Sequence, residues 1–207
     1  MTDPRQTMDR VDDQALPPAA AHAHRAVPSV EASSAPVIEN RAFAELAVGD
    51  SASIAHLVTE ADIRLFAIVS GDVNPAHVDP AYARTDAFHH VVAHGMFGGA
   101  LISSVLGTRL PGPGTIYLSQ FLRFHRPVGI GDTITARVTV RQKKPEHGDV
   151  VLDCACTNQN GETVITGIAE VRAPSEKLRL PRVALPTVSL EPPPAIAGNS
   201  FIAREPS

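Results

Sequence analysis

Two segments of the sequence place polar side chains beside prolines and glycines in a way that could support acid–base chemistry. The first segment reads Ser-Gly-Asp-Val-Asn-Pro-Ala-His-Val-Asp over residues 70–79 and contains Asp72, Asn74 and His77. An aspartate can accept a proton and a histidine can position or relay one, so this pair suits general acid–base catalysis. The alternative interpretation is structural: Asp72 caps a turn and His77 is a surface loop residue.

The second segment is His94-Gly95-Met96, which opens an apolar stretch. Free N–H groups at the start of a helix, together with the helix dipole, can stabilise negative charge on an oxygen atom. A glycine at this point lets a ligand come close to the backbone. The alternatives are that Gly95 serves packing only, and that His94 is a packed or capping histidine rather than a possible substrate contact.

The spacing of apolar residues predicts the elements that must position these segments. Residues 95–110 carry no charge before Arg109, so we expect a helix that is buried on every side. In 132–141, apolar and polar residues alternate as in a half-buried antiparallel strand. The remaining predictions are a strand over 51–57, a helix from Thr59 to Gly71, a short helix from Asp79-Pro80, and strands over 115–125, 149–157 and 162–172. This order predicts an α+β domain with an antiparallel sheet wrapped around one central helix.

Composition excludes several classes of protein. The chain has 207 residues, a formal net charge of −4 and a pI near 6.1, which argues against a nucleic-acid-binding protein. It has no apolar run of the roughly 18 residues that a membrane-spanning helix needs. The two cysteines, Cys154 and Cys156, are too few for a disulfide framework or a Cys-rich zinc site. A reduced, cytoplasmic setting fits these features, and the N-terminus shows no signal pattern.

Prolines concentrate at the two ends of the chain. Of the 18 prolines, five lie in residues 1–40 and seven in residues 174–207. We therefore predict a disordered N-terminal tail over 1–42, a folded unit over 43–173, and a Pro-rich C-terminal tail or linker over 174–207.

Taken together, these segments resemble the MaoC-like dehydratase family, specifically its (R)-specific enoyl-CoA hydratases. The family motif of Asp, Asn-Pro, His and Asp-Pro stands here as residues 72–80, and the motif Ala/Val-His-Gly-Met stands as residues 93–96. Residues 114–118 and 126–132 match the family as well, so the resemblance covers about 43–173. The segment after residue 173 resembles the linker that follows this domain in fusions with phosphate acetyl/butyryltransferases.

The resemblance implies a hot-dog fold, a curved antiparallel sheet around a long central helix, and a homodimer with a substrate tunnel near the subunit interface. It also implies reversible addition of water to a trans-2-enoyl-CoA, giving an (R)-3-hydroxyacyl-CoA. The chemistry requires no metal and no cofactor, because the CoA thioester is itself the substrate. No nucleic acid and no membrane is expected as a partner.

The resemblance further implies a role for individual residues. Asp72 would deprotonate the water, and His77 would hold it and help to deliver a proton to the α-carbon. Asn74 would orient the loop or bond to His77. The backbone N–H of Gly95 would bind the thioester carbonyl, and Ser103, unlike its neighbour Ser104, would support Asp72.

Two other functions remain open at this point. The same fold could catalyse another acyl-thioester reaction, as a 3-hydroxyacyl-carrier-protein dehydratase or a thioesterase, or it could serve as a non-catalytic acyl-thioester-binding subunit. The presence of both Asp72 and His77 argues against a thioesterase and against a binding subunit. A basic patch of Arg141, Lys143 and Lys144 could hold CoA phosphates or be a solvated turn.

Overall fold

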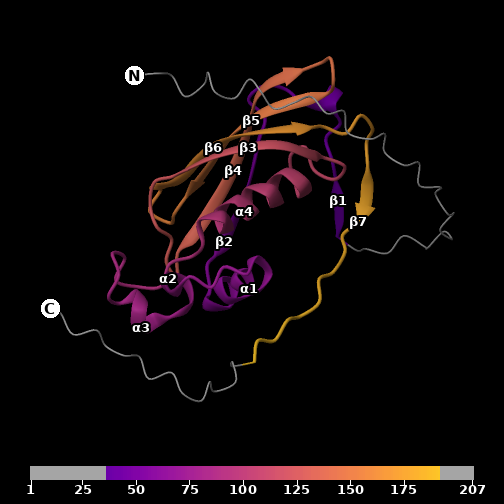
Figure 1. Ribbon diagram of the computed structural model, residues 1–207. Coiled ribbons are helices and arrows are strands. Elements are labelled where there is room, and N and C mark those ends of the chain that lie inside the picture. Colours follow the sequence, from indigo (N-terminus) through magenta and orange to yellow (C-terminus); the bar gives the residue numbers. More distant parts are fainter. Residues whose placement is uncertain (1–35, 192–207) are drawn as a thin grey trace, which may run out of the picture. The chain divides into compact units, whose positions relative to one another are not determined.

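The computed structural model describes residues 36–191, and Figure 1 shows its elements. An antiparallel sheet of five strands, in the order β2-β4-β5-β6-β3, curves around helix α4. The sheet strands are β2 (Ser51–Leu57), β3 (Ile116–Phe124), β4 (Thr133–Lys144), β5 (Asp149–Thr157) and β6 (Thr163–Arg172). The helices are α1 (Glu60–Ser70), α2 (Pro75–Val78), α3 (Pro80–Ala83) and α4 (Gly95–Thr108), with a short 3₁₀ turn, η2 (Phe43–Glu45). This is the hot-dog fold that the sequence predicts.

The core lies between α4 and the concave face of the sheet. Along β4, Ile134, Ala136, Val138 and Val140 are buried, while Arg137 between them is exposed, as the alternation predicts. Leu152 and Val150 of β5 and Val171 of β6 continue the same apolar layer. Cys154 and Cys156 also face the core and are free thiols.

Helix α1 begins and ends where the sequence places its limits. The Thr59 hydroxyl accepts the Asp62 N–H, and the Asp62 carboxylate accepts the Thr59 N–H, which together form a capping box. Gly71 ends the helix with a left-handed backbone, φ +74°, which a glycine adopts without strain. The chain therefore leaves α1 in a fixed direction, directly before Asp72.

Helix α4 is buried on one face only, so the expectation of burial on every side is wrong for the single chain. Ile102, Val105 and Leu106 are buried against the sheet, whereas Met96 is 57% exposed and Ser103 is exposed on the opposite side. The outer face of α4 carries small uncharged residues, and their spacing in the sequence does not distinguish a face that is buried from one that is exposed.

No helix in residues 36–191 is long and apolar enough to cross a membrane.

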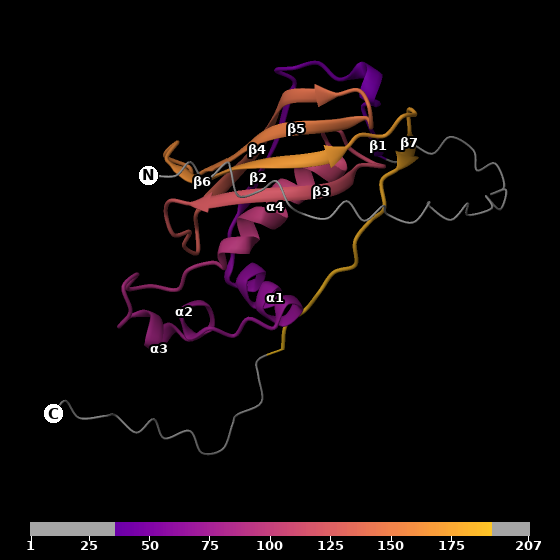
Figure 2. The same cartoon turned by 45° about the horizontal axis from the view of Figure 1, so that its top comes forward.

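The folded structure extends beyond the limits of 43 and 173 drawn from proline content. Strand β1 (Val37–Glu39) pairs antiparallel with β7 (Arg179–Pro181), and this ribbon lies at the end of the sheet away from α2 and α3 (Figures 1 and 2). We call this ribbon with Asn40 and residues 174–178 the terminal clasp. The predicted disorder of residues 1–35 and the predicted tail beyond residue 191 lie outside the described residues.

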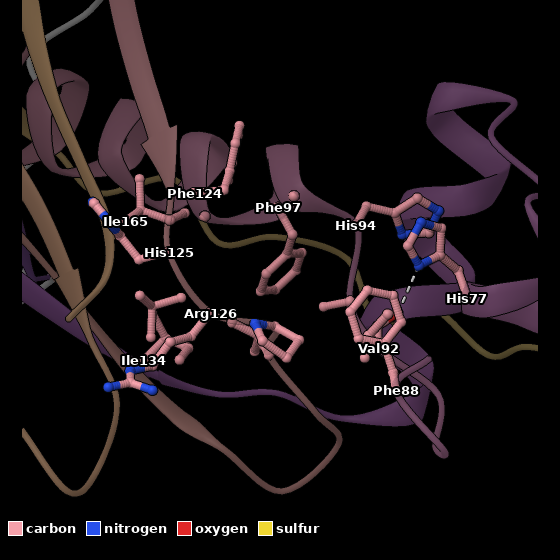
Figure 3. Close-up of a pocket in the computed structure, with 16 residues that line it drawn as sticks. His77, Phe88, Val92, His94, Phe97, Phe124, His125, Arg126, Ile134 and Ile165 are labelled. Carbon is pink, nitrogen blue, oxygen red and sulfur yellow. Dashed lines mark hydrogen bonds between the residues drawn. The ribbon is translucent and has the colours of Figure 1, made fainter. Parts of the chain in front are cut away.

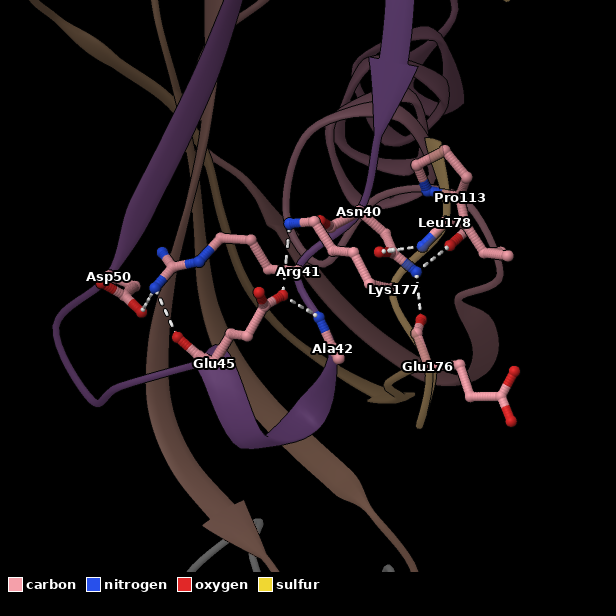
Figure 4. Close-up of polar contacts among 9 residues, drawn as sticks. All are labelled: Asn40, Arg41, Ala42, Glu45, Asp50, Pro113, Glu176, Lys177 and Leu178. Carbon is pink, nitrogen blue, oxygen red and sulfur yellow. Dashed lines mark hydrogen bonds and ion pairs between the residues drawn. The ribbon is translucent and has the colours of Figure 1, made fainter. Parts of the chain in front are cut away.

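Asn40 holds the terminal clasp together, as Figure 4 shows. Its side chain is fully buried, and its amide nitrogen donates to the carbonyls of Pro113 at 3.1 Å and Glu176 at 2.9 Å. Its amide oxygen accepts the Leu178 N–H at 2.9 Å. Asn40 and residues 176–178 are thus both fastened to the turn before β3.

Candidate active site

The first motif forms a loop that is shaped by its own side chains. The Asp72 carboxylate accepts the Asn74 N–H at 3.1 Å, and the Asn74 side chain accepts the Ala76 N–H at 3.2 Å, which caps α2. The Asn74 carbonyl accepts the His77 N–H at 2.9 Å. Proline at the first position of α2 supports this start because it needs no intrahelical acceptor. The sequence indicates only a loop here and misses α2.

Two histidines connect this loop to the segment that precedes α4. The Nδ1 atom of His77 lies 2.7 Å from the Val92 carbonyl, the contact drawn in Figure 3, and Nε2 of His94 lies 2.9 Å from the Asp72 carbonyl. A carbonyl only accepts, so each of these ring nitrogens carries a hydrogen. The other nitrogen of His77 is then the one available to a water or substrate.

Asp72, His77 and His94 come together in space. One potential ligand atom from each lies within 4.8 Å of the others, and the rings of His77 and His94 are 4.0 Å apart between centroids. Such a group could also hold a metal ion, whose ligands would be one carboxylate and two imidazoles. The chemistry expected from the sequence uses Asp72 and His77 without a metal, with His94 as no more than a possible substrate contact, and this stays a prediction.

Beside His77 an apolar cavity of about 360 Å³ opens between the start of α4 and the sheet (Figure 3). Gly95 lies in its wall, and a Cβ atom there would be 3.2 Å from the ring of Phe124. Because Gly95 is the first residue of α4, its N–H has no acceptor within the helix. The cavity therefore combines an apolar wall, a free helix N–H and the His77 ring, while Asp72 lies beside His77 outside the cavity wall.

Several wall residues were not identified from the sequence. Phe88, Phe124, His125 and Arg126 line the cavity. His125 also contacts the Thr166 hydroxyl at 2.7 Å. These residues come from separate segments with no shared motif, so spacing along the chain carries no signal for them.

His77 also borders a second cavity of about 360 Å³ with a more basic wall. Arg64, Arg84, His89 and His90 line it, and Arg64 pairs with Glu60 at 2.6 Å. The basic patch considered from the sequence is otherwise occupied: Lys143 donates to the Leu46 carbonyl, Lys144 pairs with Glu170 and Arg141 pairs with Asp153.

Ser103 lies on the outer face of α4, in an apolar groove with Phe66 and Met96. Among the described residues it makes no hydrogen bond to Asp72, so its supporting role stays a prediction. Ser104 lines a different groove, toward β1 and β7. The two serines therefore face apart, as their helical spacing predicts.

The buried thiols behind the cavity are poor nucleophiles. Burial raises the pKa of Cys156 to about 12 and that of Cys154 to about 11. Because a thiolate is the reactive form, cysteine-based catalysis is disfavoured at neutral pH.

Comparison with known proteins agrees with this geometry. Residues 48–155 match the model of the MaoC like domain. The (R)-specific enoyl-CoA hydratase of Rhodospirillum rubrum is 50% identical over 133 residues, which are 64% of this chain and 92% of the relative. The Aeromonas caviae enzyme of the same name is 40% identical over 129 residues, 62% of this chain and 96% of the relative.

A solved structure of an R-hydratase is also similar to this chain. R-hydratase PhaJ1 from Pseudomonas aeruginosa in the unliganded form superposes with a TM-score of 0.73 and 46% identity, covering 75% of this chain and all of the other. The fold is that of a hot-dog protein. The chain belongs to the MaoC-like domain family.

Proposed function

We propose that this protein catalyses the reversible hydration of trans-2-enoyl-CoA to (R)-3-hydroxyacyl-CoA. The observation that carries the proposal is that His77 and Gly95, whose N–H is free, lie in the wall of one apolar cavity, with Asp72 beside His77. The relatives named (R)-specific enoyl-CoA hydratase support the reaction and its stereochemistry.

In this proposal each group has one task. The acyl chain lies in the apolar cavity and the thioester oxygen faces the Gly95 N–H. Asp72 takes a proton from the water as the water oxygen bonds to the β-carbon, and Nε2 of His77 accepts a hydrogen bond from that water. Negative charge moves to the thioester oxygen, where the helix N–H stabilises it. The Asp72–His77 pair then delivers this proton to the α-carbon. The hydroxyl has gone to the β-carbon and the proton to the α-carbon, and both side chains are back in their starting protonation states.

CoA is the proposed carrier because the second cavity, which has the more basic wall, also begins at His77. Arg84 lies in its wall and is exposed, and an arginine suits the phosphate groups that a CoA carries. The free thiols fit a reducing compartment, and we propose the cytoplasm.

The active form is proposed to be a homodimer. Strand β3 is at the edge of the sheet, and it exposes Tyr117, Leu118, Phe121 and Phe124 beside Met96 of α4. An edge strand with apolar side chains is a template for pairing with a second chain. Pairing at β3 would also cover the groove that contains Ser103.

The test is hydration of crotonyl-CoA, followed by loss of the enoyl-thioester absorbance, with chiral analysis of the product. Loss of a general acid or base costs about 10²–10⁴ in rate, so Asp72→Asn and His77→Ala should each lose at least about 100-fold. Asp86→Asn is the matched control, since Asp86 only accepts the N–H groups of Phe88 and His89 and an Asn can do the same. EDTA should leave the rate unchanged. A fully active Asp72→Asn enzyme would contradict the proposed hydratase mechanism.

A further inference from the structure

The most buried polar group of the site is not one of the two proposed catalytic side chains. His94 is 4% exposed and precedes Gly95 as the N-cap residue of α4, but its side chain makes no capping hydrogen bond. Its Nε2 is instead directed to the Asp72 carbonyl, 22 residues earlier in the sequence. The only hydrogen bond of the His94 side chain among the described residues therefore holds the Asp72 loop and does not cap α4.

The remainder of the His94 ring is packed rather than hydrogen-bonded. It lies 4.0 Å from the His77 ring and 5.0 Å from the Phe66 ring, between centroids. Its Nδ1 is inaccessible to solvent and has no hydrogen-bond partner among residues 36–191. The ring therefore has one polar contact, and its faces fix the position of His77.

The contacts of the two histidines are reciprocal. His77 belongs to the loop and bonds the backbone of Val92, which precedes α4, whereas His94 belongs to the start of α4 and bonds the backbone of Asp72 in the loop. Together with the Val92 N–H, which donates to the Ala76 carbonyl at 3.2 Å, they set the separation between the acid–base groups and the Gly95 N–H. Chemistry at two adjacent carbons requires that separation to be correct to within about 1 Å.

We propose that His94 is a positioning residue that fixes the distance between the Asp72–His77 loop and the oxyanion-binding N–H of Gly95. The inference rests on the proposed hydratase function and changes the expected role of His94. His94 also lies in the wall of the apolar cavity, but its free nitrogen is shielded and its other nitrogen is bonded to Asp72, so the ring acts on the substrate through Asp72 and His77.

The experiment compares His94→Leu, His94→Gln and the wild-type chain with crotonyl-CoA. Leu fills the space but cannot donate, whereas the Gln amide can donate near the position of Nε2. A displacement of about 1 Å can cost roughly 100-fold, so Leu should lower kcat by about that factor, with KM within about 3-fold of wild type. Gln should restore kcat to within about 10-fold of wild type.

The control is His56→Leu, which removes a second histidine packed on the same aromatic cluster, at 5.6 Å from the Phe97 ring. It should keep its kcat. The proposal is overturned if His94→Leu keeps kcat within about 3-fold, if the loss falls on KM alone, or if Gln is as impaired as Leu. If His94→Leu does not fold, His94→Asn takes its place: its shorter amide cannot reach Asp72, so equal rates for Asn and Gln would overturn the proposal.

Hydrogen exchange separates this proposal from the hydratase assignment. The N–H groups of Asn74, Ala76 and His77 are bonded within the loop, so they should exchange faster in His94→Leu than in wild type or His94→Gln. Unchanged exchange would overturn the positioning role. If the wild-type chain hydrates no enoyl-CoA while exchange is still faster in His94→Leu than in wild type and His94→Gln, only the hydratase function is overturned.

Discussion

Replacing Asn40 by Ala should test whether the terminal clasp belongs to the cooperative fold. The substitution removes three hydrogen bonds, two donated to the carbonyls of Pro113 and Glu176 and one accepted from the Leu178 N–H. It leaves the cavity and the catalytic loop untouched, because Asn40 lines neither. Stability should therefore fall while activity at low temperature is kept.

The expected loss follows from the number and burial of these bonds. Each buried hydrogen bond contributes about 1 kcal/mol net, so three bonds give about 3 kcal/mol. For a chain of this size, about 1 kcal/mol corresponds to roughly 2–4 °C in Tm. Asn40→Ala should therefore melt roughly 6–12 °C below the wild-type protein.

Thermal unfolding followed by circular dichroism measures this difference, and the chain offers a matched control. Asn158 also makes three side-chain hydrogen bonds, to Asn160 and to the backbone and side chain of Glu162, but all of them are exposed. Water can replace exposed bonds, so Asn158→Ala should cost under about 1 kcal/mol.

Equal Tm values for Asn40→Ala and Asn158→Ala would refute the reasoning, because burial at Asn40 would then add nothing. A wild-type Tm for Asn40→Ala would show that the clasp opens separately from the sheet. Loss of kcat at 25 °C in a folded Asn40→Ala protein would contradict the separation between clasp and site.

Three further predictions follow from charge, exposure and titration. Arg84→Glu should raise KM for crotonyl-CoA by about 5- to 10-fold, as expected for an exposed ion pair with reversed charge, and leave KM for crotonyl-pantetheine unchanged; equal effects on both would contradict a phosphate contact. Phe121→Lys places a charge on the β3 edge, where Phe121 is 55% exposed, and should convert the proposed dimer to a monomer in light scattering; a wild-type monomer would contradict the proposed interface. The pKa of Glu45 is lowered from its ordinary value of 4.5 by the Ala42 N–H and then by Lys177. Its contribution to stability is therefore complete above that value and lost as pH falls through the lowered one, so the stability difference between wild type and Glu45→Gln should vanish in acid; a difference that persists there would contradict this cause.

The sheet and its central helix were predictable because their signals are local. Alternation along β4, the capping box at Thr59 and the glycine at position 71 each specify a structure from fewer than a dozen residues. The terminal clasp has no such signal. Strands β1 and β7 have three residues each and pair across about 140 positions of sequence, and the proline content of both ends favours the opposite interpretation.

The candidate site could be predicted only in part, and the roles of its residues stay predictions. Asp72, His77 and Gly95 stand in motifs, and their residue types indicate their chemistry before any distance is known. The cavity wall is different, because Phe88, Phe124 and His125 meet only when α4, β3 and the loop after α3 are assembled. In the proposed function, residues of this kind would determine which acyl chains fit, and a single sequence does not reveal them.

The reciprocal histidine contacts explain why two motifs so far apart must occur together. The loop motif alone would provide a base and a relay, and the motif before α4 would provide a free N–H, but neither alone sets the distance between them. That distance is set by His77 at Val92 and by His94 at Asp72, each bonding the backbone of the other segment, beside one backbone bond from the Val92 N–H to the Ala76 carbonyl. Because the acceptors are carbonyls, substitution of Val92 or Asp72 leaves them in place, whereas substitution of either histidine removes a donor. Val92 also lines the cavity, so a Val92→Ala enzyme should keep kcat within about 3-fold and show any loss of substrate contact in KM. A Val92→Ala kcat as low as that of His94→Leu would show that packing, and not the hydrogen bonds, holds the two segments in register.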